Sequence, residues 1–189
     1  MQAVCDGIHE ALGFESVSID LPEPESGRLA PRACYGWDVN DPTINSSMSL
    51  DELAPLLAPE FEIEGCFLLT SEEALSRVDR THTGYHSRLV GRGPHAWNDH
   101  WLLVPLYDRS GGVIGLIWTD DPVDRMLPSP ARLQALRVFA NQATTALDSA
   151  AQFEEMRFLA DHDPLTRLFN RRSFNDRLEI EAARAARYQ

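Results

Sequence analysis

The sequence contains no lysine, only three cysteines and no long apolar run, and each of these absences excludes a class of protein. All 17 basic residues are arginines, scattered along the chain rather than gathered into runs. Cys5, Cys34 and Cys66 are odd in number and widely spaced, which argues against a disulfide framework and a CxxC zinc site. No apolar stretch approaches the roughly 18 residues of a membrane span, and the first residues lack a signal-peptide pattern. The composition therefore predicts a cytoplasmic chain without membrane contact.

The charge is strongly negative and unevenly distributed. The formal net charge is −12, and the residues after Ala160 hold six arginines against five acids, which leaves −13 for residues 1–160. An acidic surface repels phosphate backbones. The charge distribution therefore predicts no binding of nucleic acid.

The dominant element is a long amphipathic helix from Ser129 to Asp161. Ser129 is a good N-cap, Pro130 suits the first helical position, and Pro164 ends the helix by restricting the residue before it. Apolar residues recur at steps of three and four, which aligns them on one side of the helix. At 1.5 Å per residue, the helix would extend roughly 50 Å, longer than one small domain needs. We therefore predict a connector between two domains.

The apolar surface of this helix is wide enough to contact two neighbours. One side can cover a sheet, while the other can meet the same helix of a second chain in a homodimer. The residues predicted to form the dimer and connector surface are Leu136, Ala140, Ala143, Leu147, Ala150 and Phe153.

The preceding residues predict an α+β domain with helices against one face of an antiparallel sheet. A helix over 2–12 ends at Gly13, and short helices begin near Ser49 and Ser71. Strands are predicted over 14–21, 28–35 and 61–70, and a hairpin joins 101–107 to 113–118. Pro105 inside a strand indicates an edge or a bulge. Asp120, Asp121 and Pro122 are expected to form a solvated turn.

Two stretches resemble the C-terminal half of a GAF domain, a small-molecule sensor. They are WLLVPLYDRSGGVIGLIWTDDP from Trp101 to Pro122 and LRVFANQATTALDSA from Leu136 to Ala150. The resemblance assigns residues 1–150 to a GAF-like domain that overlaps the terminal helix at 129–161. It implies a ligand pocket on the sheet face opposite the terminal helices, closed by residues 81–98.

The run HDPLTRLFNRRSFNDRL, from His162 to Leu178, resembles the opening of the GGDEF family of diguanylate cyclases, which join two GTP molecules into cyclic di-GMP. Arg167 stands where that family usually has glycine. The family's metal-binding, guanine-binding and GG(D/E)EF residues come later and are absent from this chain. Residues 162–189 therefore read as an incomplete N-terminal stub. The resemblance implies no catalysis by this chain, and it assigns GTP and Mg²⁺ only to the missing part of the output domain.

The candidate ligand-binding residues are aromatic or imidazole side chains in the predicted lid and hairpin. They are His82, Tyr85, His86, Trp97, Trp101 and Trp118. The tryptophans could equally be core residues. The two histidines four residues apart could ligate a metal or haem on a helix, but Gly84 between them disfavours a helix. Cys34 or Cys66 could attach a bilin, although no such motif surrounds them. We therefore predict no metal site and no evident cofactor, and the ligand would be an unknown small molecule.

Two functions follow from these patterns. The first is a sensor and dimerisation module that relays ligand binding through the connector helix to a diguanylate cyclase domain, an arrangement familiar in bacteria. The alternative is a structural dimerisation module with no ligand. An enzyme acting by itself is disfavoured, because the sequence has no recognisable nucleophile and base pair or Gly-rich phosphate loop.

Overall fold

The computed structural model describes residues 1–37, 48–78 and 86–187. The chain divides into two compact units, residues 1–145 and 146–189. The polar stretch 38–49, which Pro42 interrupts, predicts a loop, and most of it lies outside the described residues.

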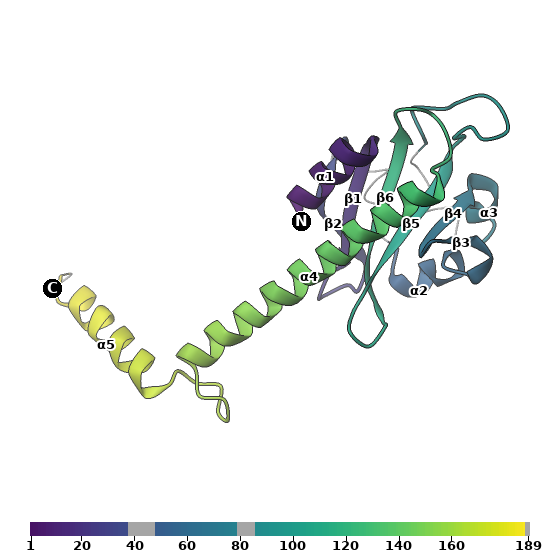
Figure 1. Cartoon of the computed structure of the whole chain (residues 1–189). Coiled ribbons are helices and arrows are strands. Elements are labelled where there is room, and N and C mark those ends of the chain that lie inside the picture. Colours follow the sequence, from purple (N-terminus) through teal and green to yellow (C-terminus); the bar gives the residue numbers. More distant parts are fainter. Residues whose placement is uncertain (38–47, 79–85, 188–189) are drawn as a thin grey trace. The chain divides into compact units, whose positions relative to one another are not determined.

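The first unit is built on an antiparallel sheet of six strands in the order β2-β1-β6-β5-β4-β3 (Figure 1). The strands are β1 Phe14–Pro22, β2 Leu29–Tyr35, β3 Glu62–Ile63, β4 Cys66–Thr70, β5 His100–Tyr107 and β6 Val113–Pro122. The predicted α+β class is confirmed. The predicted third strand region is a tight β3–β4 hairpin, with Glu64 and Gly65 in left-handed conformations at its turn.

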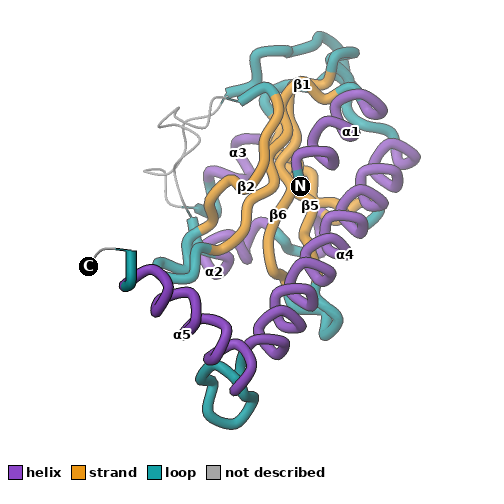
Figure 2. The backbone as a smooth tube through the Cα atoms, turned by 90° about the vertical axis from the view of Figure 1, so that its left-hand side faces the viewer, coloured by secondary structure: helices purple, strands orange, loops and turns teal. Residues whose placement is uncertain are grey.

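Helices lie on both faces of the sheet (Figure 2). On one face are α1 (Gln2–Leu12) and the start of α4 (Pro130–Asp161), and Cys66 Sγ of β4 lies 3.5 Å from the Leu133 carbonyl oxygen of α4. On the other face are α2 (Leu50–Leu53), the 3₁₀ turns Ala54–Leu56 and Pro59–Phe61, and α3 (Ser71–Leu75). Small helices therefore cover the second face in addition to the predicted pair on the first.

The helix ends follow local sequence signals. Gly13 ends α1 at φ 64°, and its N–H donates to the His9 carbonyl oxygen at 2.9 Å. Ser49 caps α2 in a capping box with Glu52. The cap of α3 is Thr70, one residue before the predicted Ser71, again in a capping box. These caps fix the short helices, because a capping side chain satisfies backbone N–H groups that have no partner inside the helix.

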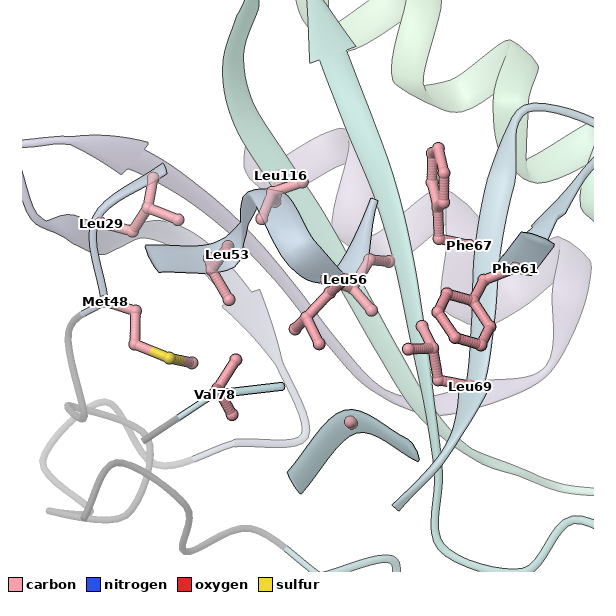
Figure 3. Packing of buried hydrophobic residues seen from close by; sticks show 11 residues of the cluster. Leu29, Met48, Leu53, Leu56, Phe61, Phe67, Leu69, Val78 and Leu116 are labelled. Atoms are coloured by element: carbon pink, nitrogen blue, oxygen red, sulfur yellow. The ribbon is translucent and has the colours of Figure 1, made fainter. Parts of the chain in front are cut away.

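An apolar core fills the space between the second face and its small helices (Figure 3). Phe67, Leu103 and Leu116 point into it from the sheet, and Leu53 and Leu56 point into it from the chain opposite. Trp101 and Trp118 pack against its border. Side chains of the protein itself therefore occupy the β4 side of this face.

Pro105 lies in β5, which is an inner strand of the sheet. β5 runs between β4 and β6, but its pairing with β4 ends at Leu103. The Pro105 carbonyl oxygen accepts a hydrogen bond from Arg137 of α4. The register shifts between Leu106 and Tyr107. The predicted irregularity is present, just beyond the proline.

The second unit contains the end of α4 and helix α5 (Arg171–Ala185), which Asn170 caps by accepting from the Ser173 N–H at 3.0 Å. α4 has 32 residues, as the caps and Pro164 predicted. From Phe153 onward, its large apolar side chains are exposed, among them Phe153 and Met156 at 62% each. Among the residues that the structure describes, no helix has both the length and the apolar composition of a membrane span.

Candidate functional site

A row of buried and half-buried polar residues crosses the second face of the sheet beside the apolar core. We call Ser16, Ser18, Asp20, Trp118 and Asp120 the polar strip. Alternate residues of a strand share a face, and the register places Ser18 opposite Trp118 and Ser16 opposite Asp120. The strip therefore lies across β1 and β6, on the face away from α1 and α4.

Asp20 is half-buried at one end of the strip. Its carboxylate accepts hydrogen bonds from the Ser18 hydroxyl and the Trp118 side chain. Burial raises the pKa of Asp20 to about 6, although these hydrogen bonds act in the opposite direction. A substantial fraction of Asp20 is therefore protonated in mildly acidic solution.

Asp120 lies at the other end and is almost completely buried. Its Oδ1 accepts from the Ser87 hydroxyl at 2.6 Å, the Trp97 indole N–H at 2.9 Å and the Asp121 backbone N–H at 2.5 Å. Burial is the main cause that raises the pKa of Asp120 to about 7, and the neighbouring Asp121 carboxylate adds to the shift. Asp120 is thus a carboxyl group that titrates near neutral pH.

Asp121 is fully buried, and it pairs with the exposed side chain of Arg88. Its Oδ2 accepts from Arg88 Nε at 2.9 Å and from the Ser16 hydroxyl at 3.0 Å. Its Oδ1 accepts from the backbone N–H groups of Arg88 at 2.5 Å and Leu89 at 2.7 Å. The expected solvated turn at Asp120 and Asp121 is therefore wrong, because residues 87–89 fold over both carboxylates and exclude water from them.

The structure unites only part of the predicted ligand set. Trp97 is fully buried, and its indole N–H also lies 2.9 Å from the Ser87 hydroxyl. Trp101 and Trp118 are half-buried, with ring centroids 5.9 Å apart and an interplanar angle of 70°. These three tryptophans lie at or beside the polar strip.

His86, the predicted histidine that the structure describes, does not join this site. His86 is exposed, and its Nδ1 lies 3.0 Å from Asp99 Oδ2. His82 and Tyr85 lie outside the described residues. No cluster of three or more His, Cys, Asp or Glu side chains suited to a metal ion occurs in the described part of the chain.

Sequence reasoning missed Asp20, Asp120, Asp121 and Arg88. The alternation of Ser16, Ser18 and Asp20 with Val17 and Ile19 was visible, but it is equally typical of a strand with one solvated face. The polar row is buried only because residues 87–89 fold over the end of β6.

The two raised pKa values predict how stability depends on pH. Between about pH 4 and 7, the folded protein retains protons on Asp20 and Asp120 that the unfolded chain releases. The free energy of unfolding should therefore fall as pH rises through this range, by on the order of 1–3 kcal/mol for each group. Asp120→Asn keeps the Oδ1 acceptor and should flatten the curve between pH 5 and 7, measured by urea unfolding at each pH.

Other groups also contribute to the pH dependence of stability, so the informative quantity is the difference between the wild-type and Asp120→Asn curves. The groups facing Asp120 are Asp121 and, across it, Arg88. If the free energy of unfolding changed equally with pH in wild type and in Asp120→Asn, the raised pKa of Asp120 would be contradicted. Asp51→Asn, on the exposed side of α2, serves as a control that should leave the slope unchanged.

Comparison with known proteins decides the family. A family model for the GAF domain matches residues 1–147. The chain belongs to the GAF family. GAF domains are sensory and regulatory modules of signalling proteins. No curated protein matches the chain.

Solved structures share this GAF fold at low sequence identity. The GAF domain/HD domain protein from Geobacter sulfurreducens is 16% identical with a TM-score of 0.55, covering 77% of this chain and 88% of that one. The GAF domain of an Acinetobacter phosphoenolpyruvate-protein phosphotransferase is 19% identical with a TM-score of 0.53, covering 78% and 80%. A methyl-accepting chemotaxis protein fragment is 17% identical with a TM-score of 0.51, covering 78% and 86%. These likenesses support the fold alone.

Proposed function

We propose that this chain is the sensory GAF module of a diguanylate cyclase. A small molecule bound at the polar strip alters the start of α4, and α4 relays the change to a GGDEF output domain. The observation that carries this proposal is one loop that contacts both the strip and the chain segment entering α4. We call residues 86–99 the coupling loop.

The coupling loop is bound to the strip at one side and to the segment before α4 at the other. Ser87 and Trp97 donate to Asp120, and Arg88 pairs with Asp121. The backbone N–H of Trp97 donates to the Arg125 carbonyl oxygen at 2.9 Å, and the backbone N–H of Leu127 donates to the His95 carbonyl oxygen at 2.8 Å. A displacement of the loop therefore acts on residues 125–127, which lie shortly before Ser129, the N-cap of α4.

The first turn of α4 is held by several directed contacts. Arg132 donates through Nε to the Leu12 carbonyl oxygen at 2.7 Å and through Nη2 to the Gly13 carbonyl oxygen at 3.0 Å. It also pairs with Asp124 at 3.0 Å. Asp124 directly precedes residues 125–127, which the coupling loop contacts. This connection gives ligand binding a contiguous route to α4, and a ligand with different affinities for two loop positions would shift their populations.

The turn after α4 supports the GGDEF part of the proposal. Asp163 Oδ1 accepts from the backbone N–H groups of Leu165 at 3.1 Å and Thr166 at 2.8 Å, and from the Thr166 hydroxyl at 2.9 Å. Arg167 has φ 59°, the left-handed conformation that glycine adopts most easily. The position where the GGDEF family usually has glycine thus has the backbone that favours glycine. GTP and Mg²⁺ would bind to later parts of such a domain.

We also propose that α4 pairs with the α4 of a second copy, through its second half. Leu136, Ala140 and Ala143 are buried by their own domain, so a partner cannot reach them. Leu147 is half-buried and Ala150 and Phe153 are exposed. Of the six predicted connector residues, the last three are thus available for an interface.

Charged substitutions on this surface test the dimer. Leu147→Glu combined with Phe153→Glu should convert a dimer to a monomer, because two like charges would face each other across a helix pair. Analytical ultracentrifugation measures the change. Asn141→Glu is the control, because exposed Asn141 lies about a third of a revolution away from both Leu147 and Phe153 on the helix. A wild-type monomer, or a dimer that both variants retain, would contradict this interface.

The packed core of Figure 3 favours a second candidate function, a structural dimerisation module without a ligand. Native mass spectrometry combined with hydrogen exchange distinguishes the two. A sensor should carry or acquire small-molecule mass, and loading should change exchange in residues 130–137. A dimer whose α4 exchanges identically after exposure to a metabolite extract would favour the structural module.

A further inference from the structure

We propose that Asp20, Trp118 and Trp101 form a subsite for a small organic cation, an amine or a quaternary ammonium group. This inference rests on the proposed sensory function, because it names the chemical class of ligand that the polar strip would take.

The three residues lie on a diagonal across three adjacent strands. Leu103 of β5 pairs with Trp118 of β6, which pairs with Ser18 of β1. Trp101 lies two residues before Leu103 in β5, and Asp20 lies two residues after Ser18 in β1. Because alternate residues of a strand share a face, Trp101 and Asp20 lie on the second face together with Trp118. The Trp118 side chain donates to Asp20, and the Trp101 ring stands at 70° to the Trp118 ring. The Asp20 carboxylate thus lies beside the Trp118 indole, and the Trp101 ring packs at an angle to that same indole.

The charge of Asp20 lacks a counterion among the described residues. Its hydrogen-bond partners there, Ser18 and Trp118, are both neutral, and no Arg or His of the described chain pairs with it. Asp121, in contrast, has Arg88 at 2.9 Å. A carboxylate removed from water without a cation is unfavourable. A cation supplied by a ligand would remove this imbalance.

The surrounding groups select a particular kind of cation. The faces of indole rings attract ammonium groups, most strongly when water is excluded. The charge of −13 on residues 1–160 also favours the approach of cations and disfavours anions such as nucleotides. A metal ion is a poorer match, because no metal-suited cluster of side chains occurs among the described residues.

A pair of probes that match in size and differ in charge tests the proposal. Tetramethylammonium and uncharged tert-butanol are titrated into the intact protein, and the indole N–H resonances of the four tryptophans are followed by NMR. Tetramethylammonium should shift the Trp101 and Trp118 resonances saturably, with a Kd on the order of 1 mM for so small a ligand. tert-Butanol should bind at least about 10-fold more weakly.

Asp20→Asn keeps the shape of the side chain and removes its charge. It should weaken tetramethylammonium binding about 10-fold or more, which corresponds to roughly 1.4 kcal/mol. Asp51→Asn is the matched control, because it removes an exposed carboxylate of α2 and should leave binding unchanged. Thermal unfolding of each variant establishes that it is folded.

Three results would overturn the cation subsite: no saturable shift, equal shifts with tert-butanol, or equal binding by wild type and Asp20→Asn. If one of these occurs while loading with a metabolite extract still alters exchange in α4, the sensory function stands and only the ligand class is refuted. If α4 does not respond while the cation binds as described, the subsite stands and the relay is refuted.

Discussion

Replacing Arg88 by methionine should lower the free energy of unfolding by about 3 kcal/mol, near the lower end of the range for breaking a buried ion pair. The Asp121 carboxylate has 0% exposure and would lose the guanidinium that pairs with it, whereas Arg88 is itself 57% exposed. Methionine retains much of the apolar stem, so the loss reflects charge and hydrogen bonding rather than packing. Urea unfolding at pH 7.0 measures the effect.

The effect should also be local to the coupling loop. Without the Arg88 guanidinium, the loop still contacts Asp121 through the backbone N–H groups of residues 88 and 89. Hydrogen exchange in residues 86–99 should therefore accelerate more than exchange in β1. Arg92→Met, in the same loop but exposed, is the control and should change stability by less than about 0.5 kcal/mol.

The double variant Arg88→Met with Asp121→Asn separates the ion pair from other causes. Because the second substitution removes the unpaired charge, the two losses should be clearly less than additive. Additive losses, or an Arg88→Met protein as stable as wild type, would show that Asp121 does not depend on its arginine.

Gly36→Ala should destabilise the protein by several kcal/mol, on the order of 3 or more. A Cβ at Gly36 would lie 1.7 Å from the Glu15 carbonyl oxygen, and the backbone there has φ 73°. The clash is with a backbone atom of β1, so no side-chain rotation relieves it, and strands β1 and β2 must separate. Thermal and urea unfolding measure the loss.

Gly27→Ala is the matched control for Gly36→Ala. Gly27 has a similar φ of 67°, but no atom lies within 4 Å of the position that a Cβ would take. Its substitution should cost about 1 kcal/mol, the strain of a left-handed residue alone. The difference between the two variants measures the close approach of β1. Equal losses would refute a steric role for Gly36.

The agreement between sequence and structure is closest where the determining forces are local. The caps at Ser49 and Ser129, the glycine that ends α1 and the hairpin turn at 108–112 depend on residues within a few positions of each other. The apolar period of α4 likewise indicated its helical state, and Ser129, Pro130 and Pro164 indicated its two ends. One face of α4 is apolar in sequence, but burial by the domain ends after Ala143, and periodicity alone did not mark that point.

The candidate site was predictable only in part. The aromatic residues of the β5–β6 hairpin were recognised because their strands were recognised. The carboxylates were not, since Asp121 and Arg88 are 33 positions apart and nothing in either segment indicates the other. A pair of acids before a proline is most simply interpreted as a solvated turn, and only a distant loop folding over it makes the opposite true.

The sequence by itself determined most elements of this protein and the ends of its main helices, because helix period, strand alternation and capping act over a few residues. Its GAF class followed from the resemblance of two stretches to that family. The tertiary structure alone decided which polar residues are buried, which half of α4 remains exposed and which loop connects the strip to that helix. Burial and charge pairing depend on which segments meet across the sheet, and the energy of desolvating Asp20, Asp120 and Asp121 exists only once they have met.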